Sequence, residues 1–168
     1  MVTTIVVLAI GLIMGTFAWG ALRGAPWVPT RRRDVDRAVA FAQPHSGARV
    51  VDLGCGDGTV LAAFAARGCR VRGWELALFP WALAQWRLRA SRSARITWGD
   101  FWRASLTDAD IVYAFLMPKV LPRVAEKLQR ELRSGALVLT YVWPMPGGTP
   151  DAVDTAVDAP PIYRYRIP

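Results

Sequence analysis

Apolar residues fill the start of the chain without interruption. The 21 residues from Val2 to Leu22 include no charged side chain, and about 20 such residues are needed to cross the hydrocarbon core of a bilayer. Arginines follow the segment and no basic residue precedes it, which favours a cytoplasmic position for everything that comes after. A cleaved signal peptide is the main alternative, but it should carry a basic start and a shorter apolar core. A buried core helix is a weaker alternative, because the segment has no polar face.

This pattern divides the chain into three parts. We expect a transmembrane anchor over residues 1–23 and a linker over residues 24–30. Pro26 and Pro29 would break any continuing helix there. Residues 31–168 would form the main domain, on the cytoplasmic side of the membrane. That length is enough for one domain with its own hydrophobic core.

Short apolar blocks then alternate between a strand-like and a helix-like spacing. Strands are predicted over 48–53, 69–76, 94–98, 109–116 and 136–143, with two further antiparallel strands in "AVDTAV" and "IYRYRI" near the end. Helices are predicted over 30–42, with Thr30 as its cap, and over 59–67, 80–89 and 119–132. This alternation indicates an α/β fold with a doubly wound, mostly parallel sheet and helices on both faces. Ligands bind such sheets beyond the carboxyl ends of the strands, where the strand order reverses.

The composition adds two constraints. The formal net charge is +8 and nearly all the basic residues are arginine, which favours anionic partners or simply gives a solvated basic surface. Cys55 and Cys69 are expected to be free thiols in a reducing compartment. With His45 as the single histidine, the chain does not have the residues for a histidine–cysteine metal site, and no metal is expected.

The stretch "VVDLGCGDGTV", residues 50–60, carries the strongest chemical signal. Gly54, Gly56 and Gly58 allow a tight turn and let backbone amides approach a ligand. The spacing is neither G-x-G-x-x-G nor a phosphate-binding loop ending in G-K-[ST]. Asp52 and Asp57 flank the loop and would repel a pyrophosphate while attracting a cation. S-adenosylmethionine, which has an ammonium, a sulfonium and a ribose, fits this loop better than a dinucleotide does.

Acids at the next two strand ends support this cofactor. Glu75 ends the second predicted strand, 19 residues after Gly56, where a carboxylate can accept the ribose hydroxyls. The third strand ends in "WGDFW". Asp100 is expected to accept from the adenine amino group, and Phe101 or Trp102 to cover the adenine ring.

The segments "VVDLGCGDGT", "GWEL", "GDFW" and "ADIVYAFLMP", in this order and spacing, resemble class I, seven-strand S-adenosylmethionine-dependent methyltransferases. "PWVPT", "FLMPKVLPRVAEKLQRELRSG" and "LTYVWPMPGGTP" resemble more narrowly the protein-lysine N-methyltransferases of the ATP synthase c-subunit and adenine nucleotide translocase type and their archaeal relatives. The resemblance implies a Rossmann-like seven-strand sheet and S-adenosyl-L-methionine as cofactor. The cofactor-binding residues it implies are Asp52, Gly54, Gly56, Asp57, Glu75, Asp100 and Phe101.

The loop after the fourth strand, Phe115 to Pro118, would face the transferred methyl. Tyr113, Met117 and Pro118 are the candidate catalytic residues. This loop is not the [DN]-P-P-[YFW] loop of enzymes that methylate base or glutamine amino groups. Aromatic walls could guide a lysine ammonium and lower its pKa by desolvation; Tyr113, Trp74 and Trp143 are candidates, although each could simply fill the core. The expected acceptor is thus a lysine side chain of a protein, membrane proteins included. The alternatives are a small molecule or lipid, RNA, or a non-catalytic membrane scaffold, and nucleic acid is the less favoured partner.

Overall fold

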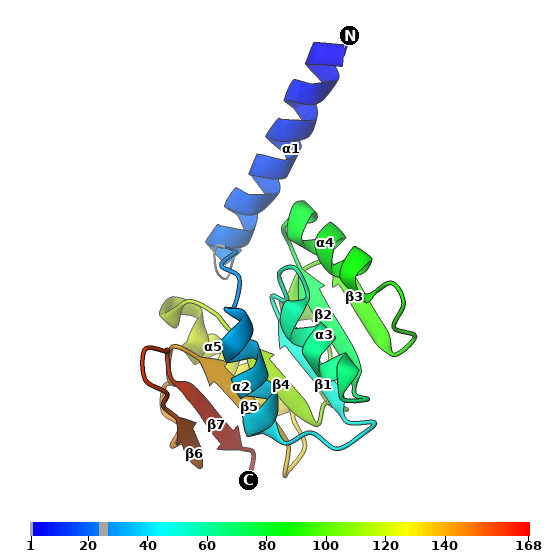
Figure 1. The fold of residues 1–168 in the computed structure, drawn as a ribbon. Helices are drawn as coiled ribbons and strands as arrows, with labels where there is room; N and C mark the ends of the chain where they lie inside the picture. The colour runs from blue at the N-terminus through cyan, green and yellow to red at the C-terminus, as the bar shows by residue number, and fades with distance from the viewer. Residues whose placement is uncertain (1, 24–26) are drawn as a thin grey trace.

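The computed structural model describes residues 2–23 and 27–168, which form a seven-stranded sheet with helices on both faces (Figure 1). The strand order is β3-β2-β1-β4-β5-β7-β6. Strands β1 to β5 are parallel to one another, β7 is antiparallel to β5, and β6 is antiparallel to β7. The strands span Arg49–Leu53 (β1), Arg70–Glu75 (β2), Ala94–Trp98 (β3), Ile111–Ala114 (β4), Leu137–Tyr141 (β5), Ala152–Asp154 (β6) and Ile162–Arg166 (β7). The predicted doubly wound, Rossmann-like sheet is confirmed.

Two hydrophobic clusters hold the helices against the sheet. Helices α2 (Arg32–Ala42), α3 (Thr59–Ala66) and α4 (Leu78–Leu88) pack on one face, in a cluster that includes Val39, Leu61 and Phe64. Helix α5 (Leu121–Glu131) covers the other face through Leu121, Val124 and Leu128. Short 3-10 helices η1 (Phe101–Arg103) and η2 (Pro118–Val120) follow β3 and β4. The helix predicted over 119–132 is therefore present, and it buries one face against the sheet.

Helix α1 (Val2–Arg23) extends away from the sheet domain (Figure 1). The C-terminal half of α1 contacts the start of α4, where the Leu78 amide donates a hydrogen bond to Thr16 Oγ1 at 3.1 Å. Among the described residues, no helix combines the length and the apolar character that a membrane crossing requires. The predicted transmembrane anchor over residues 1–23 is thus not supported. Residues 24–26 of the predicted linker lie outside the described residues.

One local prediction is wrong. Thr30 does not cap α2: the capping position is Arg31, which has no side-chain cap bond, and the helix begins at Arg32. The Thr30 hydroxyl instead lies 3.5 Å from the hydroxyl of Tyr113 in the middle of the sheet. Thr30, which the local sequence assigned to a helix end, therefore contacts a distant residue of the sheet instead.

The topology determines where a ligand can bind. The chain runs outward from β1 to β2 and β3 and then returns to place β4 on the other side of β1. The strand order therefore reverses between β1 and β4, and the crevice beyond the carboxyl ends of these strands is where such sheets bind ligands. The glycine loop follows β1 directly, so it lies at this crevice.

Candidate functional site

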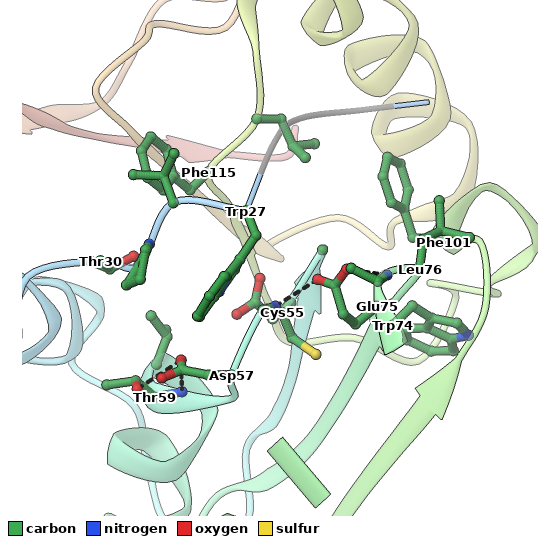
Figure 2. Close-up of a pocket in the computed structure, with 18 of the residues that line it drawn as sticks. Trp27, Thr30, Cys55, Asp57, Thr59, Trp74, Glu75, Leu76, Phe101 and Phe115 are labelled. Atoms are coloured by element: carbon green, nitrogen blue, oxygen red, sulfur yellow. Dashed lines mark hydrogen bonds between the residues drawn. The ribbon is translucent and has the colours of Figure 1, made fainter. Parts of the chain in front are cut away.

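A cavity of about 70 Å³ opens at the carboxyl ends of β1, β2 and β4 (Figure 2). Its walls come from the glycine loop, the end of β2, the segments after β3 and β4, and the stretch that precedes α2. Of the predicted site residues, seven line it: Asp52, Gly54, Gly56, Asp57, Glu75, Phe101 and Tyr113. Residues far apart in the sequence meet here because the ends of parallel strands share one edge of the sheet.

Glu75 holds the glycine loop in place. One oxygen of its carboxylate accepts a hydrogen bond from the Gly56 amide at 2.9 Å, and the other accepts from the Ala77 amide at 2.7 Å. The side chain is 9% exposed, and burial raises its pKa, although these two amide bonds and one from Leu76 act in the opposite direction. A carboxylate offers about four acceptor positions. Backbone amides use some of these positions, and the acceptor capacity that remains can take a ribose hydroxyl.

Asp57 has structural partners of its own. Its carboxylate accepts from the backbone amide and the hydroxyl of Thr59, at 3.2 and 2.8 Å, and so stabilises the first turn of α3. Arg87 of α4 forms an ion pair with the same carboxylate at 2.7 Å. Asp57 thus keeps the start of α3 in place, and its charge is shared with Arg87 before any ligand arrives.

Asp52 differs from the other two acids because no hydrogen bond to its carboxylate is found among the described residues. It is 3% exposed, at the end of β1. Burial raises its pKa well above the usual value, and the nearby charges of Glu75 and Asp57 raise it further. A buried carboxylate without a donor favours a cationic partner, since a positive charge would offset the cost of ionising it. Asp52 is therefore the residue best placed to meet a ligand ammonium.

Tyr113, Thr30 and Phe115 form the opposite wall. Tyr113 on β4 lies beside Asp52 in the parallel register, is 1% exposed and reaches the Thr30 hydroxyl. Burial raises the pKa of its phenol well above the ordinary value. Phe115 packs edge-on against Tyr141, with ring centroids 4.8 Å apart. This wall presents aromatic surface and neutral hydroxyls, which suits the aliphatic stem of an incoming amine.

The sequence matches a known family over more than half of its length. Residues 52–152 correspond to the family described as "ANTKMT methyltransferase domain". The chain belongs to this family. The matched range includes the glycine loop, Glu75 and the segment after β4.

Similar proteins in other organisms are named as lysine methyltransferases. The chain is 35% identical over 131 residues to the ATP synthase c-subunit lysine N-methyltransferase of Rattus norvegicus, covering 75% of this chain and 59% of the relative. It is 31% identical over 151 residues to a protein-lysine N-methyltransferase of Saccharolobus islandicus (strain REY15A), covering 84% and 93%. The chain thus spans about three-fifths of the length of the rat relative.

A solved structure shares the fold. The crystal structure of an RNA methyltransferase from Salinibacter ruber, in complex with S-adenosyl-L-homocysteine, superposes with a TM-score of 0.80 at 26% identity, covering 84% of this chain and 94% of that one. The family and this structure both agree with the cofactor predicted from the glycine loop.

Three predicted site residues of this family member lie away from the cavity. Asp100 lines an adjoining groove with Trp74 and Trp98, and its carboxylate caps η1 by accepting from the Trp102 amide at 3.0 Å. Met117 precedes η2 and is 39% exposed, and Pro118 begins η2. Neither Met117 nor Pro118 is part of the cavity wall. Their roles, and that of Asp100 toward adenine, stay predictions.

The aromatic candidates divide in the same way. Trp74 lines the cavity, whereas Trp143 is exposed and its carbonyl accepts from Thr140. Phe115, which the sequence placed in the loop facing the methyl, lines the cavity, and so do Trp27 and Thr30, which sequence reasoning did not assign to the site. The motif "PWVPT" was a signal for Trp27 and Thr30, because Pro29 favours a non-helical segment that returns to the sheet.

Proposed function

We propose that this protein is an S-adenosylmethionine-dependent protein-lysine N-methyltransferase. The observation that carries the proposal is the buried carboxylate of Asp52, which has no hydrogen-bond donor among the described residues, beside a glycine loop held by Glu75. The chain belongs to the ANTKMT methyltransferase domain family. The relatives named as lysine methyltransferases support the choice of acceptor.

The cofactor would rest on residues from neighbouring strand ends. Asp52 would pair with its ammonium, the amides of the glycine loop would contact its amino acid portion, and Glu75 would accept from its ribose. When bound, S-adenosylmethionine supplies a methyl group on a positively charged sulfur, which is already a good leaving group. The protein's contribution is then mainly to position the two reactants and to exclude water.

The acceptor lysine would enter along the wall of Tyr113, Thr30 and Phe115. Its ammonium, with a pKa of about 10.4 in water, must lose a proton before its lone pair attacks the methyl carbon and the carbon–sulfur bond breaks. Aromatic surface lowers that pKa by desolvation. The hydroxyl of Tyr113 orients the neutral amine. It is not the base that deprotonates the ammonium, since burial keeps the phenol protonated.

We also propose that the enzyme works at a membrane, with its catalytic domain on the cytoplasmic side. Apolar side chains on α1, including those of Ile5, Val7 and Leu8, are exposed, and a contiguous apolar surface of this kind favours a lipid environment. Exposed arginines follow at positions 31–33, where they would meet anionic headgroups. Membrane proteins would then be natural substrates, because confinement to one surface raises their effective concentration.

The decisive test is transfer of a labelled methyl group from the cofactor in membranes that contain or lack the enzyme. Mass spectrometry is expected to find lysines that gain 14 mass units per methyl, with no gain when Asp52→Asn replaces the wild type. The matched control is Asp36→Asn, which alters an exposed carboxylate on α2. Label in lipid, in a small molecule or in RNA instead of lysine would replace the lysine assignment by that acceptor. No label in any fraction would support a non-catalytic scaffold.

A further inference from the structure

The indole of Trp27 lies against the glycine loop and approaches its backbone closely at Gly56. A Cβ atom placed on Gly56, where φ is +53°, would lie 2.8 Å from Trp27 Nε1 and 2.9 Å from Cδ1. Figure 2 shows the ring projecting into the cavity, with Thr30 and Phe115 on one side and Glu75 on the other. The tryptophan therefore occupies the space over the backbone that a ligand of this loop must approach.

The remaining space is small. The cavity measures about 70 Å³, whereas pockets for small molecules and cofactors usually measure about 300–1,000 Å³. The other walls are strand ends and loops held by backbone hydrogen bonds, such as those from Gly56 and Ala77 to Glu75. Trp27 is held mainly by ring contacts with other described residues, so its side chain is the wall that can move at least cost.

Those ring contacts lead to α1. The Trp27 ring packs against Phe17 of α1 and Phe79 of α4, with centroid distances of 6.1 and 6.3 Å. The Thr16 hydroxyl, next to Phe17, accepts from the Leu78 amide of α4. The position of α1 on α4 therefore determines whether Trp27 has Phe17 as a second aromatic partner, beside Phe79, that holds it over the loop.

We propose that Trp27 is an autoinhibitory plug: its indole occupies cofactor space, and the contact between Phe17 and Trp27 couples cofactor entry to the position of α1. The proposal rests on the cofactor assignment of the proposed function. Cofactor binds after the indole leaves, and a membrane or substrate that draws α1 away from α4 opens the site. The apparent affinity then equals the intrinsic affinity multiplied by the fraction of molecules in which the site is open.

The test is calorimetric titration of the full-length protein with S-adenosylhomocysteine. Trp27→Ala is expected to bind about tenfold more tightly than wild type, since it leaves the site permanently open. Trp27→Phe should fall between them. The matched control is Trp86→Ala, which removes an indole that is 65% exposed on α4 and should leave the affinity unchanged. Circular dichroism of each variant confirms that it is folded.

A second measurement tests the coupling to α1. Phe17→Ala leaves every residue of the glycine loop intact and should also tighten binding, by about threefold. In stopped-flow experiments, the observed binding rate of wild type should reach a plateau with ligand concentration, while that of Trp27→Ala should keep rising. Unchanged binding by Trp27→Ala overturns the plug. Weaker binding also overturns it and makes the indole a wall that stacks on the cofactor. Absence of binding by both proteins overturns the cofactor assignment itself.

Discussion

The Glu75 carboxylate accepts a hydrogen bond from the Gly56 amide at 2.9 Å, which joins the end of β2 to the loop after β1. The acid that the sequence assigned to the ribose therefore also shapes the loop. A buried carboxylate with two amide donors resists displacement, because moving it away would leave both donors unpaired. Loop geometry and cofactor recognition thus depend on one side chain.

Replacing Glu75 should affect both functions. Glu75→Ala is expected to weaken cofactor binding by about 1.5–3 kcal/mol, the value of hydrogen bonds to a charged group, and to destabilise the fold by about 1–3 kcal/mol through the two orphaned amides. Calorimetry and chemical denaturation measure the two effects. Glu126→Ala, which removes an exposed carboxylate from α5, serves as the control. An unchanged affinity in folded Glu75→Ala would remove Glu75 from the ribose site.

The raised pKa of Asp52 predicts proton release when cofactor binds. Burial, then the charges of Glu75 and Asp57, hold that pKa well above 3.8 in the free protein. A bound ammonium favours the ionised form and lowers the pKa. The affinity for the cofactor should therefore rise with pH between the pKa of Asp52 in the bound protein and its higher pKa in the free protein, by up to about tenfold per pH unit.

Titrations in two buffers of different ionisation enthalpy count the released protons. The ligand also titrates, so the informative quantity is the difference between wild type and Asp52→Asn, which should release fewer protons and bind more weakly. Equal proton counts in the two proteins would show that Asp52 does not meet the ammonium.

The sequence predicted the sheet and the cofactor edge because both depend on local patterns. Apolar periodicity marked each strand, and parallel strands bring Asp52, Glu75 and Tyr113 to one edge. Side-chain packing was not accessible in this way. Gly73 on β2 faces the loop so closely that a Cβ would lie 2.6 Å from Cys55 Sγ, yet nothing in "RVRGWE" indicates this contact.

Trp27 was missed for the same reason, since its position depends on how distant segments fold back over the loop. The linker looked like a simple connection, whereas its described part forms a cavity wall. Asp100 was placed at the right strand end, but its carboxylate turned toward the Trp102 amide. Strand ends can be predicted from the sequence, whereas the direction of a side chain beyond the strand end cannot.

A buried network should make the fold sensitive to acid. Asp34 on α2 is fully buried and accepts from the Tyr141 hydroxyl and from Arg37, both at 2.8 Å. Arg37 also pairs with Asp154 on β6 at 2.6 Å, so the network ties α2 to the end of the sheet. Burial acts to raise the pKa of Asp34, but the hydrogen bonds from Tyr141 and Arg37 outweigh it and the pKa is lowered below 3.8.

A lowered pKa contributes stability that is present above pH 3.8 and is lost as pH falls through the lower, folded value. Asp34→Asn should therefore destabilise the protein by about 3 kcal/mol near neutral pH, since it leaves Arg37 with one carboxylate partner fewer. The difference in free energy of unfolding between Asp34→Asn and wild type should become smaller in acid. Denaturation monitored at several pH values checks this, with Asp36→Asn on the exposed side of α2 as control. A difference that is constant with pH would contradict it.

Tyr113→Phe separates orientation of the amine from its deprotonation. The Tyr113 hydroxyl is buried 3.5 Å from the Thr30 hydroxyl, and burial raises its pKa above the usual range, so it remains protonated throughout an assay and cannot act as the base. Loss of one hydrogen bond should lower turnover by up to about tenfold and leave cofactor affinity within about twofold. Tyr163→Phe on β7, outside the cavity wall, is the matched control. The shape of the pH–rate profile decides between the two roles: an unchanged profile with lower amplitude is the expected result, because the ionising group is the substrate amine. Disappearance of the alkaline limb in Tyr113→Phe would instead make Tyr113 the titrating group in catalysis.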